Sequence, residues 1–519
     1  MRAFPAALLL AVISSPVVSV GQLSYGGHPV GLVRNAGLPE APLVVLPEVD
    51  VEALKARDAE QAASGIKGPF KFGFNHQVDL DMEYSGVWRT MSNGDRVWRV
   101  AVQCPGALSI NFEFHEFIVP EGAQVFVYND LGEVLGGFEA ASNPGRTELG
   151  VSPLGGDKIT IEYVEPARVA GQGRLRIGQV THAYRDILGG TKSLNESGSC
   201  NNNVICPVGD PWRDQIRSVA MIVVQGDGIC TGTLINNCEN DGTPYFLTAN
   251  HCLGNPNNWI FRFNWNSPNC TPTTNGSYNS ISGAQLLANS GASDVALLRL
   301  NTTPPPLHNV YYSGWDKGTT AATSVTCIHH PSGDIKKISF ENQAVTASTY
   351  SGASCWRVAA WDDGTTEQGS SGSGLWNQNG LLVGQLYGGQ ADCDVNINDY
   401  FGRFNVSYPL LDEWLGNCGN TLPGFDPAVT SIPEDHKGAA ILLTPNPTSG
   451  QVNVLLPDLG SGPVALEVID ATGRTVFQRT TASGNTWTTL DLSDEPNGLY
   501  LVQAMAGGVR VVERLVLNH

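Results

Sequence analysis

The chain is short of positive charge and of charged residues altogether. Its 519 residues hold 30 lysines and arginines against 49 aspartates and glutamates, so the formal net charge is −19, and only 15% of the residues are charged. Nucleic acids and anionic membranes attract basic surfaces, so this balance argues against both as partners. It suits a protein that stays dispersed in solution.

Long apolar runs are also scarce. At the N-terminus Arg2 precedes the apolar residues 6–13, and the small residues Ser19 and Gly21 precede Gln22. This order is typical of a cleaved secretory signal peptide, which we place at residues 1–21; a buried apolar segment is the alternative. No other stretch is long and apolar enough to cross a bilayer as a helix, so we expect a soluble chain after cleavage.

Metal-binding patterns are lacking too. The sequence has 11 cysteines but no C-x-x-C pair and no His/Cys cluster with zinc spacing. In an exported chain the cysteines are expected to form disulfides, and neither a metal nor an organic cofactor is predicted. Ten of the 11 lie between Cys200 and Cys418, while Cys104 stands alone upstream, as expected for one bridged domain.

Turn residues, by contrast, are plentiful, with 59 glycines and 31 prolines. Between residues 22 and 192 they separate short runs in which apolar and polar positions alternate. This period of two indicates an antiparallel β-sandwich. The clearest runs are 97–103, 108–114, 124–128 and 158–163, and residues 51–63 are predicted as a helix.

The rest of the chain divides into two further domains, and the fold class is all-β. Residues 193–418 hold short strands with long loops, which suits a double β-barrel. Strands are expected at 218–224, 233–235, 245–248, 259–264, 295–300 and 381–386, and a closing helix around 412–415. Residues 419–440 are rich in Pro, Gly, Thr and Ser and are predicted as a linker. Six or seven short strands in residues 441–519 indicate an immunoglobulin-like β-sandwich.

Three short strings carry residues of catalytic type. They are TANHC at 248–252, SDVALL at 293–298 and GSSGSG at 369–374. They supply a histidine, an aspartate and a serine in the chain order of the chymotrypsin-like proteases. A serine becomes a nucleophile when an imidazole takes its proton, and a buried carboxylate orients that imidazole. Ser370 and Ser373 compete for the role of nucleophile, but only Ser371 occupies the G-x-S-G register.

From residue 199 to about 408 the chain resembles the lysyl endopeptidases, a bacterial branch of the chymotrypsin-like proteases. The resemblance rests on GSC at 198–200, RDQIR at 213–217, CTGTL at 230–234, YFLTA at 245–249, HHP at 329–331 and GQLYGG at 384–389. It implies His251 as general base, Asp294 as the carboxylate that orients it and Ser371 as nucleophile. It also implies that the N–H groups of Gly369 and Ser371 form the oxyanion hole.

The resemblance also implies a pocket for lysine. Trypsin-like enzymes carry the pocket acid about six residues before the nucleophile, where this chain has Thr365. The acid of the lysyl endopeptidases matches Asp399 instead. A carboxylate at the bottom of a narrow slot suits the compact ammonium of lysine. Gly388 and Gly389 are expected to form the pocket wall, where a side chain would obstruct entry.

Some positions near the site depart from the pattern or leave alternatives open. Asp392 and Asp394 are close enough to Asp399 in sequence to remain alternatives for the pocket acid. Ser370 replaces the aspartate that pairs with the new N-terminus in trypsin-type zymogens, so that activation switch is not expected. Tyr387 stands where lysyl endopeptidases can carry histidine, which affects the rate and pH response rather than the triad.

Five disulfides are expected. The resemblance implies Cys200–Cys393, Cys206–Cys270 and Cys230–Cys252. The remaining cysteines suggest Cys327–Cys355 and Cys238–Cys418. Such bridges restrict the unfolded chain and would help the enzyme survive outside the cell.

Lysine placement suggests where the chain is processed. The sequence has nine lysines against 21 arginines. Lys192 lies just before the family-like region and Lys437 lies in the predicted linker, so maturation is predicted to cut after Lys192 and Lys437. Chance placement in a lysine-poor chain is the alternative.

Residues 441–519 resemble the C-terminal sorting domains of the type IX secretion system. The resemblance rests on PNPTSG at 445–450, DATGR at 470–474 and NGLY at 497–500. It implies an export address across the outer membrane that is removed or exchanged for a surface anchor. The alternative is a sandwich that binds carbohydrate or protein. Residues 22–192 would then be a propeptide that blocks the cleft or assists folding.

Together these observations predict a secreted serine endopeptidase that cleaves after lysine through an acyl-enzyme. Its expected partners are protein or peptide substrates, its own propeptide and the secretion machinery. The alternatives are the same triad with arginine or mixed basic specificity, and a catalytically silent surface adhesin. The mature protein is expected outside the cell, either released or attached to the outer surface of a bacterium.

Overall fold

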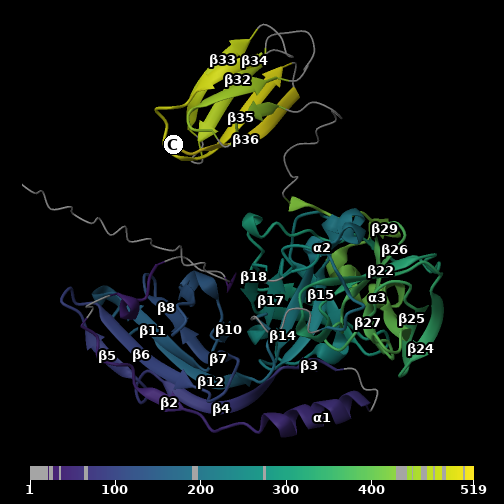
Figure 1. Ribbon diagram of the computed structural model, residues 1–519, viewed down its shortest axis with the longest axis horizontal. Helices are drawn as coiled ribbons and strands as arrows, with labels where there is room; N and C mark the ends of the chain where they lie inside the picture. Colours follow the sequence, from purple (N-terminus) through teal and green to yellow (C-terminus); the bar gives the residue numbers. More distant parts are fainter. Residues whose placement is uncertain are drawn as a thin grey trace, which may run out of the picture. The chain divides into compact units, whose positions relative to one another are not determined.

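The computed structural model describes residues 21–22, 27–33, 37–63, 68–189, 197–272, 276–427, 441–446, 448–456, 464–470, 474–481, 487–506 and 509–519. Strands dominate these residues, which confirms the all-β fold class (Figure 1). The chain forms two compact units, Met1–Pro427 and Ala428–His519. Within the described ranges, no helix has both the length and the apolar character that crossing a membrane requires.

The N-terminal part of the first unit is a β-sandwich, as predicted. One sheet contains β2 (Leu43–Val45), β5 (Val87–Thr90), β6 (Arg96–Gln103), β8 (Gln124–Asn129), β9 (Val134–Phe138) and β11 (Lys158–Glu165). The other contains β4 (Gly73–Asp81), β7 (Ser109–Ile118), β10 (Leu149–Gly155) and β12 (Arg174–Ala183). Apolar side chains from both sheets, among them Trp98, Phe112 and Val180, meet in one core, as in other packed sandwiches.

A helix lies where the sequence predicted it, between β2 and the other strands of the sandwich. Helix α1 spans Val51–Ala63. Asp50 caps its first turn, because the Asp50 carboxylate accepts a hydrogen bond of 3.0 Å from the backbone N–H of Ala53.

A third sheet forms the first β-barrel. It contains β1 (Gly21–Gln22), β3 (Phe70–Lys71), β14 (Val219–Val224), β15 (Gly228–Leu234), β16 (Tyr245–Ala249), β17 (Ile260–Phe263), β18 (Asn279–Ser282), β19 (Ala284–Ser290) and β20 (Val295–Leu300). Two of these strands, β1 and β3, come from before residue 192. Strand β1 pairs with β18 and β3 pairs with β15, so the N-terminal segment contributes to the barrel sheet itself.

A fourth sheet forms the second β-barrel (Figure 1). It contains β13 (Asn202–Asn203), β21 (Trp315–Asp316), β22 (Val325–His329), β23 (Lys337–Glu341), β24 (Thr346–Tyr350), β25 (Ala353–Ala360), β26 (Gly374–Asn377), β27 (Leu382–Gly389), β28 (Ile397–Arg403) and β29 (Thr421–Leu422). Helix α2 (Arg213–Ser218) lies between β13 of this sheet and β14 of the first barrel. One core cluster joins the barrels, with Leu247 and Leu297 from the first and Trp376 from the second.

The closing helix is longer than the sequence indicated. Helix α3 spans Phe404–Leu415 rather than only residues near 412, and Pro409 lies inside it. Its buried side chains include Phe404, Tyr408, Leu411 and Leu415. Their spacing of four, three and four residues is that of one helical face, which packs against the barrels.

The predicted linker, 419–440, begins too early. Strand β29 lies within that range and pairs with β21, where Leu422 faces Trp315. Beyond it, Arg217 Nη2 and Asp426 Oδ2 form an ion pair of 2.6 Å. These contacts hold the chain to the barrels as far as Pro427, and 428–440 lie outside the described residues.

The second unit is a separate β-sandwich of immunoglobulin-like type, as predicted. One sheet contains β30 (Leu442–Thr444), β31 (Gln451–Leu455) and β34 (Trp487–Asp491). The other contains β32 (Val464–Asp470), β33 (Thr475–Thr481), β35 (Gly498–Ala506) and β36 (Val509–Leu517). Apolar residues of both sheets, such as Val452 and Val502, form its core.

Candidate active site

His251 and Asp294 are brought together by two paired strands. Strand β16 ends at Ala249 and pairs with β20, which begins at Val295, so the residues after β16 and before β20 meet. His251 lies in the 3-10 turn Asn250–Cys252. Its Nδ1 donates to Asp294 Oδ2 at 2.8 Å, and its backbone N–H donates to Asp294 Oδ1 at 3.0 Å. The carboxylate therefore fixes both the ring and the backbone of the histidine.

Asp294 is held in place from the second barrel. Its φ of +52° is rare for a residue with a side chain, and its carbonyl accepts from the Asn250 N–H at 2.8 Å. Gln385 Nε2, on β27, donates to the carbonyls of Ser293 (2.8 Å) and Asp294 (3.2 Å). Burial raises the pKa of the Asp294 carboxyl, and the two hydrogen bonds from His251 oppose that shift.

Ser371 lies on a loop that is tied to the first barrel. Thr231, on β15, donates from its N–H to the Ser371 carbonyl (2.8 Å) and from its hydroxyl to the Gly369 carbonyl (2.9 Å). Gly372 has φ +84°, and a Cβ there would lie 2.2 Å from Thr248 Oγ1. Only glycine fits so close an approach, which explains the glycine after the serine.

The competing serines are engaged elsewhere. Ser370 Oγ lies 2.7 Å from His329 Nδ1, and Ser373 Oγ lies 3.2 Å from Cys327 Sγ. Ser371 is 1% exposed, and its backbone carbonyl lies 3.9 Å from Cys252 Sγ, next to His251. Within the described part of the chain, His251 Nε2 is buried and makes no hydrogen bond, so the link to the serine hydroxyl is not formed in this state.

Two backbone N–H groups, those of Gly369 and Ser371, are available in the main chain around the serine. Gly369 has φ +88°. Among the residues that the structure describes, neither the Gly369 N–H nor the Ser371 N–H donates to a backbone carbonyl, whereas the Ser370 and Gly372 N–H groups do. An oxyanion hole requires uncommitted N–H groups of this kind, from the nucleophile itself and from a residue just before it.

Asp399 lies buried on β28, with 0% of its surface exposed. Its Oδ2 accepts hydrogen bonds from Trp361 Nε1 at 2.8 Å and from Thr366 Oγ1 at 2.6 Å. Gly389, on β27, pairs with Asp399, and a Cβ on Gly389 would lie 2.3 Å from Asp399 Oδ1. Glycine therefore keeps the neighbouring strand clear of the carboxylate, and Gly388 pairs beside it with Tyr400.

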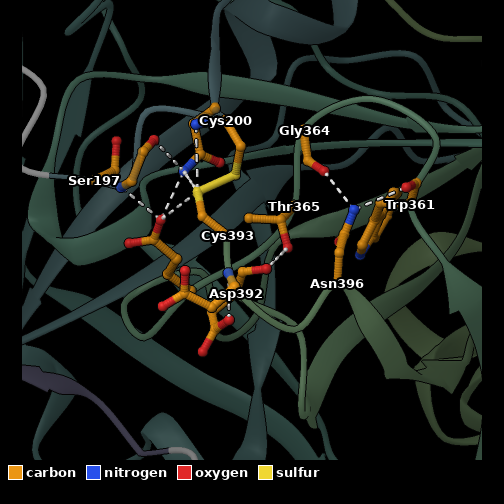
Figure 2. The surroundings of a disulfide bond; sticks show 12 residues. Ser197, Cys200, Trp361, Gly364, Thr365, Asp392, Cys393 and Asn396 are labelled. Atoms are coloured by element: carbon orange, nitrogen blue, oxygen red, sulfur yellow. Dashed lines mark hydrogen bonds between the residues drawn. A yellow bond between two sulfur atoms is a disulfide. The ribbon is translucent and has the colours of Figure 1, made fainter.

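The other acids of this loop lie in a different setting. Asp392 and Asp394 are exposed, and Asp392 Oδ1 accepts from the Asp394 N–H at 2.8 Å within a turn. Figure 2 shows this loop beside the disulfide Cys200–Cys393. The same view shows Thr365 Oγ1 donating to the Asp392 carbonyl (3.4 Å), so Thr365 fastens the loop rather than supplying an acid.

An aromatic group borders the histidine. The Tyr387 ring stacks on the His251 ring, with centroids 5.6 Å apart and planes at 25°. Tyr350 packs edge-on against Tyr387 at 5.2 Å and stacks on Tyr400 at 4.5 Å. Tyr387 could be identified from the sequence, whereas Tyr350 and Tyr400 could not, because no motif marks residues that approach the site from separate strands.

The described residues contain four disulfides. They are Cys200–Cys393, Cys206–Cys270, Cys230–Cys252 and Cys238–Cys418. The expected fifth bridge, Cys327–Cys355, is wrong, because both cysteines are free and buried. Cys327 lies on β22 and Cys355 on β25, and β26, β27 and β28 stand between these strands in the sheet order. Burial raises the pKa of the Cys355 thiol to about 12, so it stays protonated.

Lys192 and Lys437 lie outside the described residues, as do residues 1–20 of the predicted signal peptide.

Two β-barrels with a histidine–aspartate pair on one and a glycine-flanked serine on the other define a class of enzyme. This chain is a serine endopeptidase of the chymotrypsin-like fold, and its substrates are proteins or peptides.

Comparisons with known proteins give the family. Residues 194–402 match the lysyl endopeptidase C-terminal domain, and residues 443–518 match a secretion system C-terminal sorting domain. The lysyl endopeptidase of Pseudomonas aeruginosa is 30% identical over 369 residues, which cover 63% of this chain and 77% of that protein. The chain belongs to the lysyl endopeptidase family. Its sorting domain indicates export through a secretion system.

Solved structures were compared as well. A mutant of human heparin binding protein is 19% identical, with a TM-score of 0.30 and coverage of 40% of this chain and 95% of that chain. The serine endoprotease of Yersinia pestis is 13% identical, with a TM-score of 0.28 and coverage of 59% and 94%.

Proposed function

We propose that this protein is a secreted endopeptidase that cleaves peptide bonds after lysine, with Ser371, His251 and Asp294 as its catalytic triad. The observation that carries the proposal is the two-point hydrogen bonding of His251 by the buried Asp294, beside the loop of Ser371. An imidazole whose Nδ1 donates to a carboxylate presents a basic Nε2.

Acylation follows from this arrangement. Ser371 Oγ attacks the carbonyl carbon of the scissile bond while His251 Nε2 takes the hydroxyl proton. The carbonyl oxygen becomes an oxyanion, which the N–H groups of Gly369 and Ser371 stabilise. His251 then gives its proton to the departing amine as the carbon–nitrogen bond breaks. Asp294 stays ionised and stabilises the imidazolium between these steps.

Deacylation repeats the sequence with water. His251 Nε2 takes a proton from water, and the resulting hydroxide attacks the ester carbon. The second oxyanion collapses, Ser371 Oγ leaves and recovers its proton from His251, and the product carboxylic acid departs. The unbonded Nε2 is compatible with this role, since catalytic hydrogen bonds often tighten only when substrate binds.

Lysine preference is assigned to Asp399. Trp361 and Thr366 both donate to its Oδ2, which keeps the buried carboxylate oriented. A compact ammonium matches a single buried carboxylate better than the wide, planar guanidinium of arginine. The lysyl endopeptidase name of the 30% identical relative supports the same specificity.

The remaining parts of the chain fit a route to the cell exterior. Residues 1–21 would serve as signal peptide, 22–192 as propeptide and 441–519 as the type IX sorting domain. Maturation would cut after Lys192 and after Lys437, and the mature protease would be released or attached at the outer surface. Its propeptide would be a partner of the protease domain during export.

A serine-directed sulfonyl fluoride tests the catalytic assignment. Incubation with the mature protease is expected to abolish activity and to modify Ser371 alone, because the hydroxyls of Ser370 and Ser373 are hydrogen-bonded elsewhere. Peptide mapping by mass spectrometry locates the adduct. The variant His251→Ala serves as control and should react far more slowly. Modification of Ser370 or Ser373 instead, or a folded wild type that never reacts, would overturn the proposal.

A further inference from the structure

The N-terminal sandwich is joined to the first barrel by main-chain pairing as well as by the connecting chain. Strand β3 adds to the edge of β15, with Phe70 opposite Ile229 and Lys71 opposite Gly228. Lys71 Nζ forms an ion pair of 2.6 Å with Asp227 Oδ1. The N–H of Phe72 donates to the Asp227 carbonyl at 2.9 Å.

The same sandwich forms hydrogen bonds with the hairpin between β14 and β15. Asn111 Nδ2 donates to the Gly226 carbonyl at 2.9 Å, and Asn75 Nδ2 donates to the Gln225 carbonyl at 2.8 Å. A Cβ on Gly226 would lie 2.6 Å from Gln179 Nε2, so the hairpin tip rests directly on the sandwich. Strand β15 leads from this tip to Cys230, whose disulfide partner Cys252 follows His251.

A second contact holds the segment that follows His251 and Cys252. Asn255 Nδ2 donates to Glu148 Oε2 at 3.1 Å, and Arg146 Nη1 donates to Asn257 Oδ1 at 2.9 Å. Asn258 Nδ2 donates to Glu113 Oε2 at 2.9 Å. The sandwich thus fixes residues 255–258, only a few positions after the catalytic histidine.

The sandwich also completes the core of the first barrel. Ile187 is fully buried in a cluster that includes Met221 and Trp265 of the barrel. Arg262, on β17, is fully buried and donates from Nη1 to the Ile187 carbonyl at 2.6 Å. Within the described residues its Nε and Nη2 make no hydrogen bond, and its guanidinium lies 4.1 Å from the centroid of the Tyr278 ring. The propeptide carbonyl is therefore the acceptor that this buried cation uses.

We propose that the N-terminal sandwich is retained after the chain is cut between residues 189 and 197, as a noncovalent subunit that completes the first barrel and steadies the segment after His251. The proposal rests on the maturation cut of the proposed function. Departure of the sandwich would expose the Ile187 cluster to water and remove the carbonyl that accepts from the Arg262 guanidinium. Both changes disfavour separation.

Contacts at the catalytic residues support retention rather than blocking of the cleft. Among the described residues, the hydrogen bonds and ring contacts of His251, Asp294 and Ser371 all go to the two barrels. None of them comes from residues 27–189. A sandwich that binds the first barrel without contacting the triad residues can stay bound while substrate enters.

The test cuts the chain without using its own activity. In a full-length Ser371→Ala variant, residues 190–196 are replaced by the recognition sequence of an unrelated site-specific protease. After cutting, gel filtration and native mass spectrometry are expected to show both fragments together in a 1:1 complex at submicromolar concentration. Separation of the two fragments of this variant at pH 6, with the protease fragment still folded, would overturn the proposal. A failed triad assignment would leave this result unchanged.

A matched pair of variants locates the contact. Ile187→Asp is expected to weaken the cut complex by about 100-fold, because it places a charge in an apolar cluster beside a core of the barrel. Leu131→Asp makes the same change at a residue that is 73% exposed and should leave the complex intact. Circular dichroism of the uncut chain shows whether each variant folds. Should Ile187→Asp not fold, Asn111→Ala, which removes the donor to Gly226, is expected to weaken the complex by about tenfold.

The carboxylates in the interface predict that the affinity of the N-terminal sandwich for the first barrel depends on pH. Burial raises the pKa of Glu113 to about 7, with help from the negative charges of Glu148 and Asp227 and against the hydrogen bond from Asn258. Burial also raises the pKa of Asp227, which Lys71 and then Arg57 oppose. A pKa that is higher in the complex than in the free fragment means that protons favour binding. The stabilisation is complete below the ordinary glutamate pKa and is lost as pH rises through about 7.

This pH dependence is measured on the cut Ser371→Ala complex. Its dissociation constant is expected to rise about tenfold between pH 6 and pH 8.5, and Glu113→Gln should flatten most of that rise. Glu121→Gln, at an exposed glutamate of the same sandwich, is the control and should keep the wild-type profile. If the dissociation constant of the cut Ser371→Ala complex fell as pH rises, the retained contact at Glu113 would be contradicted.

Discussion

Replacing Asp294 by asparagine in the mature protease is expected to lower kcat about 10⁴-fold, with a much smaller change in KM. The carboxylate accepts from both Nδ1 and the backbone N–H of His251, so it holds the ring with Nε2 unprotonated. An amide at this position can donate to Nδ1, which favours the tautomer with the proton on Nε2. That histidine can no longer take the proton of Ser371.

Kinetics with a short lysyl peptide amide, over a range of substrate concentrations, separate kcat from KM. Asp412→Asn makes the same substitution at an exposed position of helix α3 and should retain wild-type kinetics. Melting temperatures establish that both variants are folded. A kcat for Asp294→Asn within tenfold of the wild type, in a folded protein, would remove Asp294 from the triad.

Replacing Asp399 by alanine is expected to lower kcat/KM for cleavage after lysine by about 10³-fold. The substrate ammonium would enter a buried slot that no longer holds a negative charge, and desolvation would oppose its binding. The donors Trp361 and Thr366 would lose their shared acceptor as well. Digestion of a mixed peptide library, with the cleaved bonds read by mass spectrometry, measures the preference for each residue.

Two controls make this result specific. Asp392→Ala removes the exposed acid of the neighbouring turn and should leave lysine cleavage unchanged. The rate at which the sulfonyl fluoride modifies Ser371 should be similar in wild type and Asp399→Ala, because the pocket acid does not touch the triad. Equal lysine cleavage by both proteins would show that Asp399 is not the selector. Comparable wild-type cleavage after arginine would replace lysine specificity with mixed basic specificity.

The local parts of the fold and site could be predicted from the sequence. Strand patterns of period two marked β6, β7, β8 and β11, and β20 lies at the predicted residues 295–300. His251, Asp294 and Ser371 each lie in a short string with its own chemical signature, and the structure brings the first two into contact. Strings of this kind are readable because the backbone around each residue is set by its immediate neighbours.

Features that depend on distant parts of the chain were not predictable. Nothing in the sequence separated Cys327 and Cys355 from the bridged cysteines, because their separation depends on the order of strands in the sheet. Pro409 obscured the first turns of helix α3, whose apolar face becomes clear only against the barrels. The docking of Glu113 and Ile187 on the first barrel likewise joins residues that are far apart in sequence.

Each barrel binds the main chain of a proposed catalytic residue that the other barrel carries. Thr231 of the first barrel binds the main chain of Ser371, and Gln385 of the second binds the main chain of Asp294. The proposed triad therefore has all of its main-chain supports only after the two barrels have docked. With the proposed triad, peptide cleavage would begin only after this docking, so a chain that is still folding during export would be inactive.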